Sequence, residues 1–184
     1  MIAHVDPFEF LKEALAHLDG RFFRVIGGQA LGSLHLPRAT VDIDLLVDSP
    51  ALLSDSWPAN PDRAIRRADS PLDPLDAVVE WWPDEGDPRV PVQVIVLNRP
   101  WLTELLQQPG GKIELGGVLL EAVSPVALVV LKVYAGGPRD RADVELIATH
   151  KDWPVWKAEI ERRMAQFPRK IQKTWAKWNP GAQE

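Results

Sequence analysis

The stretch that decides the fold is residues 25–46, VIGGQALGSLHLPRATVDIDLL. It begins with β-branched residues that end a strand, turns at two glycines and continues into a short helical stretch, residues 29–34. Over residues 40–47 apolar and acidic side chains alternate, which predicts a second strand. Asp42 and Asp44 then project from the same face of that strand. The stretch therefore predicts a strand, a glycine turn, a helix and a strand that carries two paired carboxylates.

The glycine pair and the carboxylate pair together favour a nucleotide site. Two carboxylates on one face of a strand can hold one or two magnesium ions, which take oxygen ligands and bridge to nucleotide phosphates. Gly27 and Gly28 let backbone amides approach phosphate oxygens where a strand enters a helix. Each feature alone has a plain structural explanation, as a turn or as the solvent face of a strand. Their ordered combination with Arg38 and Thr40 is what predicts a site for a nucleoside triphosphate and magnesium.

This combination resembles the signature of the polymerase β-like nucleotidyltransferases. It is particularly similar to the bacterial branch of minimal nucleotidyltransferases and AbiEii-type toxins, which carries two glycines, an Arg-x-Thr/Ser step and a strand with acids at alternate positions. The resemblance implies a mixed α+β nucleotidyltransferase fold, with a small mixed sheet flanked by helices and a helical C-terminal part. It implies Mg²⁺ as cofactor. It also implies that Asp42 and Asp44 are the catalytic metal ligands, and that Gly27, Gly28, Arg38 and Thr40 lie at the nucleotide.

A second stretch, residues 124–144, resembles the second conserved block of that family, a helical lysine followed by a basic-acidic step and a further aspartate. The resemblance implies that Lys132 lies near the triphosphate and that Asp140 and Asp143 lie near the cleft. The apolar residues around Lys132 predict almost all-round burial of its helix, where an unpaired lysine is costly. For Asp140 and Asp143 an equal alternative is a helix start, where acidic side chains are favourable.

One acidic residue of the family pattern is missing. Active members generally carry a third acid on a later strand, where it helps to bind the catalytic metal and to deprotonate the attacking hydroxyl. The matching strand here is residues 91–97, and Gln93 or Ile95 occupies the position of that acid. An amide binds a hard cation weakly and cannot act as a base. Glu80, on the neighbouring strand, compensates only if it faces the acid pair; the alternative is a solvent-facing residue.

The rest of the chain predicts one mixed α/β core, residues 1–122, followed by a helical part, residues 123–184. Expected helices cover residues 8–18, 63–67 (weakly), 101–108, 125–135, 139–149 and 154–178. Further strands are expected at residues 21–26, 76–82 and 90–97, with a hairpin of residues 112–115 and 118–122. Ser124 and Pro125 are expected to begin the apolar helix, and Gly136 and Gly137 to end it.

Composition limits the partners and the compartment. The 184 residues have a net charge of -5, which gives no general attraction for phosphate backbones, so DNA is not an expected partner. The chain has no cysteine, no recognisable signal peptide and no apolar stretch of membrane-spanning length. We therefore expect a cytoplasmic protein without a membrane partner.

The C-terminal tail combines basic residues with tryptophans between residues 153 and 178. Such interleaving can grip single-stranded RNA or a tRNA end by stacking and charge. The favoured alternative is that the tryptophans cover a core while the lysines stay in water.

Three functions remain open from the sequence. The first is a transferase that moves a nucleoside monophosphate from an NTP to a tRNA, a protein or a small-molecule acceptor, with a role as the toxin of a toxin–antitoxin pair. The second is a catalytically degenerate protein of the same fold that binds nucleotides or partners. The reason for considering it is the missing third acid. A drug-modifying nucleotidyltransferase shares the acid pair, but no acidic drug-binding surface is recognisable.

Overall fold

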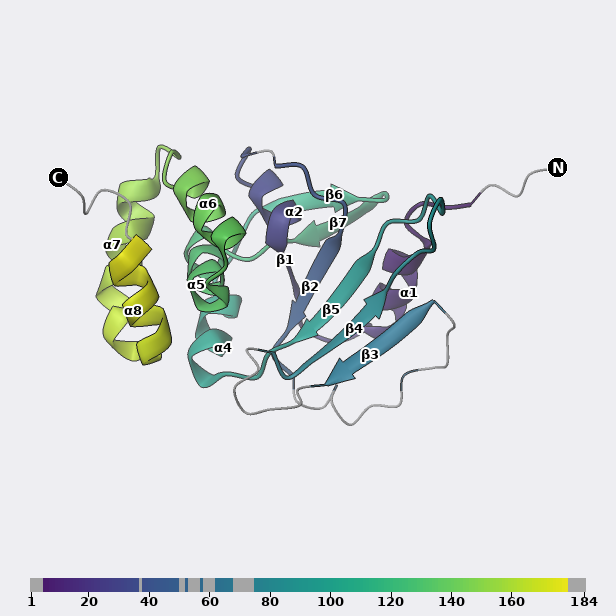
Figure 1. Ribbon diagram of the computed structural model, residues 1–184, viewed down its shortest axis with the longest axis horizontal. Helices are drawn as coiled ribbons and strands as arrows, with labels where there is room; N and C mark the ends of the chain where they lie inside the picture. Colours follow the sequence, from purple (N-terminus) through teal and green to yellow (C-terminus); the bar gives the residue numbers. More distant parts are fainter. Residues whose placement is uncertain are drawn as a thin grey trace. The chain divides into compact units, whose positions relative to one another are not determined.

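The computed structural model describes residues 5–36, 38–49, 52, 57, 62–67 and 75–178. The chain divides into two compact units, the first made of Met1–Arg99 and Gly111–Ala122, the second of Pro100–Gly110 and Val123–Glu184. A mixed sheet lies in the first unit and helices make up the second (Figure 1). The mixed α+β architecture expected from the sequence is therefore confirmed.

A five-stranded sheet forms the centre of the first unit. Its strands are β1 (Arg24–Ile26), β2 (Ile43–Val47), β3 (Arg63–Arg67), β4 (Ala77–Trp81) and β5 (Val92–Val96), in the spatial order β1-β2-β5-β4-β3. Strands β2 and β5 are parallel, and the other neighbours are antiparallel. Strand β2, which carries Asp44 and directly follows Asp42, thus lies inside the sheet, between β1 and β5 (Figure 1).

The prediction of a weak helix at residues 63–67 is wrong. These residues form strand β3, which pairs antiparallel with β4 from Arg63 opposite Trp81 to Arg67 opposite Ala77. Five residues are too few to form a stable helix by themselves, whereas β4 offers a complete ladder of backbone partners. Tertiary pairing of this kind overrides a weak local helix propensity.

Apolar side chains bury one face of the sheet. Ile43, Leu45 and Val47 of β2 are all fully buried, as the alternation of the sequence predicts. Helix α1 (Glu9–His17) packs against β5 and buries Phe10, Leu11 and Ala14. The opposite face carries Asp44, and there the short helix α2 (Gly27–Gly32) follows β1 and contacts β2. A separate hairpin, β6 (Lys112–Leu115) and β7 (Val118–Glu121), contacts α2 and β1.

The second unit is built around the apolar helix α5 (Pro125–Ala135), which contacts α4 (Pro100–Gln107), α6 (Pro138–Ile147), α7 (Trp153–Arg163) and α8 (Arg169–Trp178). As expected, Ser124 caps α5: its hydroxyl accepts a hydrogen bond from the Ala127 amide at 3.2 Å. Gly136 ends α5 in the left-handed region, with φ of 81°. No helix within the described ranges has the length and apolar character needed to cross a bilayer.

The tail expected as one helical segment, residues 154–178, is interrupted. Helix α7 ends at Arg163, a short 3-10 turn covers Met164–Gln166, and α8 begins at Arg169. The break falls at Phe167, whose extended backbone (ψ of 153°) precedes Pro168. A residue before proline is disfavoured in the helical region, so the sequence itself contains the cause of this break.

Candidate nucleotide and metal site

Asp44 lies in a row of three polar residues on the three middle strands of the first unit's sheet. Its register partners are Ile26 on β1 and Gln93 on β5, and Gln93 in turn lies opposite Glu80 on β4. Asp42 directly precedes β2, and the alternation of side chains puts it on the same side as Asp44. Both aspartates are half-buried. The sheet therefore presents the acid pair and its nearest polar neighbours on one face.

Gly27 lies directly against the carboxylate of Asp44. It has a φ of 66°, in the left-handed region that only glycine adopts readily, and a β-carbon placed on it would clash with Asp44 Oδ2. Both the backbone conformation and the space available require glycine here. The first glycine of the pair thus allows the acid-bearing strand to approach the turn that follows β1.

Gly28 leaves room for two further predicted residues, Arg38 and Thr40, in the same way. A β-carbon there would lie 2.7 Å from Arg38 Nη2 and 2.7 Å from the β-carbon of Thr40. The Thr40 hydroxyl donates a hydrogen bond to Asp42 Oδ1, which fixes that carboxylate. The six candidate residues of the first unit, Gly27, Gly28, Arg38, Thr40, Asp42 and Asp44, are therefore brought together at one place.

Gln93 and Ile95, the two residues at the expected position of a third acid, lie on β5 opposite Asp44 and Leu46 of β2, and Gln93 has its own partner. Gln93 Nε2 donates a hydrogen bond to Glu80 Oε1 at 2.9 Å. Glu80 does face the side of the sheet that carries Asp44, but two strand spacings away, which is about 10 Å between backbones. Within the part of the chain that the structure describes, no three Asp, Glu, His or Cys side chains cluster as a metal site. Among the residues that the structure describes, the carboxylates at this place are those of Asp42 and Asp44.

Lys132 in the second unit forms an ion-pair cluster. Its ammonium lies 3.0 Å from Asp140 Oδ1 and 2.8 Å from Asp143 Oδ2, and the side chain of Lys132 is 13% exposed. Asp143 is 2% exposed, so its charge is buried and compensated by the lysine. Asp140 also accepts a hydrogen bond from the Gly137 amide at 3.1 Å, which caps the start of α6. The two aspartates thus occupy a helix start and neutralise Lys132.

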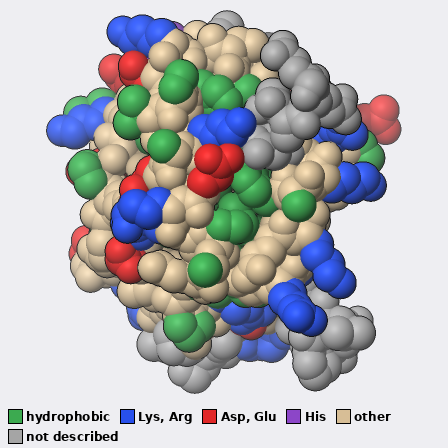
Figure 2. All heavy atoms as spheres, turned by 90° about the vertical axis from the view of Figure 1, so that its left-hand side faces the viewer, with side chains coloured by type: hydrophobic (Ala, Val, Ile, Leu, Met, Phe, Trp, Pro, Cys, Tyr) green, Lys and Arg blue, Asp and Glu red, His purple; other side chains and the backbone are tan. Residues whose placement is uncertain are grey.

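In the basic tail, helix α8 buries its tryptophans and exposes its basic side chains. On α8 the side chains of Ile171, Trp175 and Trp178 are buried, whereas Arg169, Lys170, Lys173 and Lys177 are exposed. Figure 2 shows the side of the molecule that carries α7 and α8, where Lys and Arg side chains alternate with acidic and apolar ones. This arrangement is the one expected when tryptophans cover a core and lysines remain in water.

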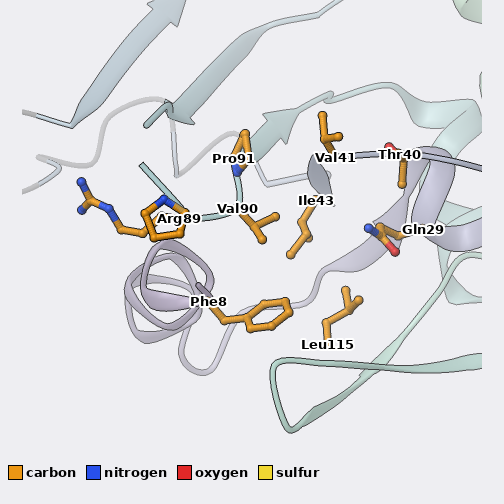
Figure 3. Close-up of a pocket in the computed structure, with 10 residues that line it drawn as sticks. Phe8, Gln29, Thr40, Val41, Ile43, Arg89, Val90, Pro91 and Leu115 are labelled. Atoms are coloured by element: carbon orange, nitrogen blue, oxygen red, sulfur yellow. The ribbon is translucent and has the colours of Figure 1, made fainter. Parts of the chain in front are cut away.

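A pocket of about 380 Å³ lies in the first unit, and no pattern in the sequence pointed to it directly; Asp42 and Asp44 are not among its lining residues. Its lining includes Phe8, Gln29, Thr40, Ile43 and Leu115, which come from separate parts of the first unit (Figure 3). Gln29 follows the glycine pair immediately, and its Nε2 donates to the backbone carbonyl of Asp42 at 3.4 Å. That adjacency in sequence was the one signal that could have indicated Gln29 as a site residue.

Comparisons with known proteins show a distant structural similarity. It is to the crystal structure of an antigenic nucleotidyltransferase-like protein from Paracoccidioides brasiliensis, with 15% sequence identity and a TM-score of 0.42, over 94% of this chain and 87% of that chain. No family model matches the sequence, and no curated protein matches it. A similarity at this level assigns neither a family nor an activity.

Proposed function

We propose that this protein binds a nucleoside triphosphate with Mg²⁺ at the Asp42–Asp44 pair and transfers its nucleoside monophosphate to an acceptor. The observation that carries this proposal is the convergence of the glycine pair on the acid strand. Gly27 makes room for Asp44, and Gly28 makes room for Arg38 and Thr40. A plain turn next to a plain strand has no need of either close approach.

The acid pair suits one magnesium ion held together with phosphates. Magnesium in proteins is commonly bound through one or two carboxylates plus substrate phosphates and water. Asp42 is oriented by the Thr40 hydroxyl, and Asp44 lies against Gly27. When bound, the ion would neutralise charge on the phosphates. Arg38, next to Gly28, supplies a fixed positive charge on the same side of the site.

The reaction would be a displacement at the α-phosphorus. An acceptor oxygen forms a bond to that phosphorus, the bond to the oxygen that bridges to the β-phosphorus breaks, and pyrophosphate leaves. The acceptor hydroxyl gives up its proton. Gln93 cannot take this proton, because an amide is not a base, so the proton goes to solvent or to a carboxylate of the row.

A second candidate function is nucleotide binding without transfer. The specific observation in its favour is the hydrogen bond from Gln93 to Glu80, which fills the place of a third acid with an amide already paired to a carboxylate. Both candidates share the same nucleotide site and differ only in turnover. Acceptors such as a tRNA, a protein hydroxyl or a small molecule, and an antitoxin partner, belong to the transferase proposal.

Two measurements, first of nucleotide binding and then of turnover, test the two candidate functions. Titration calorimetry with ATP, GTP, CTP and UTP in the presence of Mg²⁺ is followed by an assay for pyrophosphate release. Asp42→Asn combined with Asp44→Asn is expected to abolish binding, while the exposed pair Asp84→Asn and Glu85→Gln is the control of equal charge change. Intact binding in the first variant would exclude the site. Tight binding without pyrophosphate release, with every acceptor class supplied, would favour the second candidate.

A further inference from the structure

A second pocket of the first unit lies on the face of the sheet opposite Asp44. It has a volume of about 260 Å³, and its lining comes from α1 and from strands β3 and β4: Glu13, Ala16, His17, Arg63 and Trp81. Arg63, on the strand at the end of the sheet (Figure 1), lies in register with Trp81, and the same row continues through β5 to Ile43 of β2. Residues directly opposite each other share a face of the sheet. The pocket is therefore separate from the candidate nucleotide site.

Arg63 is a buried arginine with little counter-charge. Its side chain is 4% exposed, and its guanidinium carbon lies 5.8 Å from the ring centroids of both Trp57 and Trp81. Nη1 of Arg63 lies 3.4 Å from Glu13 Oε1, a long contact to a side chain that is itself 35% exposed. Within the part of the chain that the structure describes, Nε of Arg63 is buried without a hydrogen-bond partner. Such a group costs free energy unless an acceptor meets it.

Trp81 provides a second buried donor next to the first. The residue is fully buried, and its Nε1 has no hydrogen-bond acceptor among the described residues. A buried indole N–H usually has a partner. The β-carbons of residues directly opposite each other on antiparallel strands are about 5 Å apart, so Arg63 and Trp81 are immediate neighbours. Both groups are donors, and an occupant that satisfies them has to supply acceptor atoms.

The remaining walls of the pocket are apolar or aromatic. His17 stacks on Trp57 with ring centroids 3.6 Å apart, and Trp57 lies edge-on to Trp81 at 5.8 Å. Ala16 adds a methyl group from α1. The volume is close to the lower end of the range of roughly 300–1,000 Å³ that is typical of small-molecule pockets. A fitting occupant is therefore small, with acceptor atoms at one end and an apolar body at the other.

We propose that this pocket binds a small monocarboxylate, whose oxygens accept hydrogen bonds from Arg63 Nε and Trp81 Nε1. A carboxylate has two oxygens with about four lone-pair sites, and its shape matches one edge of a guanidinium. A single negative charge suits the pocket, because Glu13 already offsets part of the charge of Arg63. A phosphate group, with about two negative charges, would leave an excess. The inference goes beyond the proposed function and does not depend on it.

Nuclear magnetic resonance of the unaltered protein tests the proposal directly. The probes are acetate, propionate and butyrate, with propionamide as the neutral counterpart. We expect butyrate to shift the indole N–H signal of Trp81, identified by its loss in Trp81→Phe, with a dissociation constant on the order of 1 mM. Each methylene fewer should weaken binding about threefold, and propionamide should bind at least about tenfold more weakly than propionate. If no carboxylate shifts this signal, water meets the two donors and the proposal is overturned.

Arg63→Lys tests the donor that the proposal assigns to the ligand. Lysine keeps the positive charge but has no counterpart of Nε, so butyrate affinity should fall at least about tenfold. Arg24→Lys is the matched control, because Arg24 is also largely buried and lies over an aromatic ring, that of Phe22, but lines a different pocket. Equal butyrate affinity in these two variants would overturn the assignment.

A further measurement on the unaltered protein covers the case in which Arg63→Lys does not fold. Nuclear Overhauser contacts are expected between the methylene protons of bound butyrate and the indole N–H of Trp81. Contacts confined to other residues would overturn the proposal. The combined variant Asp42→Asn and Asp44→Asn should bind butyrate within about twofold of the unaltered protein. A larger change would mean that the probe binds at the nucleotide site, and the pocket assignment would fail while the proposed function stands.

Discussion

The α-carbon of Gly27 lies against the carboxylate of Asp44, so that any β-carbon at position 27 would collide with Asp44 Oδ2. The same glycine has a φ of 66°, in the left-handed region. Replacement of Gly27 by any residue with a β-carbon therefore has two separate energetic costs. One is a backbone cost, which any left-handed glycine shares, and the other is a steric cost that falls on a carboxylate of the proposed metal site.

Gly27→Ala is expected to destabilise the fold and to abolish Mg²⁺-nucleotide binding. The left-handed backbone alone costs an alanine about 1–2 kcal/mol, and displacement of Asp44 adds to that. Gly20→Ala is the matched control, because Gly20 has a φ of 72° and a β-carbon added there would meet no heavy atom within 4 Å. Urea unfolding should show a loss in both variants, and calorimetry a loss of binding only for Gly27→Ala. Equal nucleotide affinity in the two variants would contradict the role given to the contact.

Thr40→Val tests the orientation of Asp42. Valine keeps the shape of threonine but removes the hydroxyl that donates to Asp42 Oδ1. We expect Mg²⁺-nucleotide affinity to fall about tenfold, because a hydrogen bond to a charged group contributes about 1.5–3 kcal/mol. Thr40→Ser keeps the donor and should stay within about threefold of the original affinity. Similar losses in both variants would indicate that packing, and not the hydroxyl, matters.

Gln93→Asp tests whether the polar row can be completed. The new carboxylate would lie in register with Asp44, and we expect Mg²⁺ affinity to rise about tenfold, since carboxylates are the preferred ligands of this ion. Adding Glu80→Gln should increase the gain, because it removes the repulsion between two neighbouring acids. Gln107→Asp, at an exposed helical position, is the control for added charge. Unchanged Mg²⁺ affinity in Gln93→Asp would argue against a metal at this row.

Lys132→Met is expected to destabilise the protein by about 3–5 kcal/mol, because it leaves the charge of Asp143 buried without the counter-ion that Lys132 supplies. Combining it with Asp143→Leu should recover most of the loss. Lys151→Met, at an exposed position, controls for the loss of a lysine. The readout is the free energy of unfolding in urea. A small loss in Lys132→Met would show that the ion-pair cluster contributes little to folding.

Glu159 gives a pH-dependent contribution to the stability of the second unit. Hydrogen bonds from Arg162 and then Arg163 lower the pKa of Glu159 to about 2, from 4.5. A lowered pKa in the folded state stabilises at pH values above the unfolded pKa, and this gain disappears as the pH falls from about 4.5 to 2. With screening by solvent, Glu159→Gln should cost about 1 kcal/mol at pH 7 and almost nothing near pH 2. A constant difference between protein and variant from pH 7 to pH 2 would contradict this origin.

The central part of the fold could be predicted because its signals are local. The glycine turn, the alternation of residues 40–47 and the Ser124 cap each lie within one short stretch, and the structure bears out all three elements. The prediction for residues 63–67 was wrong because nothing in the local sequence distinguishes a weak helix from an edge strand. Their conformation depends on β4, which follows later in the chain.

The grouping of the candidate residues in space was predictable to a similar extent. Gly27, Gly28 and Asp44 came from their order and spacing, and their close approach follows from the pairing of β1 with β2. That Glu80 bonds to Gln93, and does not approach Asp44, depends on the strand order, which the sequence does not specify. The pairing of Lys132 was foreseeable in kind, since burial demands a counter-charge, but not which acid would supply it.

The route of the chain limits how this protein can be dissected. Helix α4 groups with the second unit, and the β6–β7 hairpin that follows it groups with the first, so the backbone passes from one unit to the other three times. Trp101 of α4 packs on Tyr134 and Phe167, with ring centroids 5.2 Å and 6.1 Å apart. A fragment that starts at residue 123 would lack these contacts. No single cut of the gene yields either unit whole, so a gain or loss of either unit in evolution would have required more than fusion or truncation at one point.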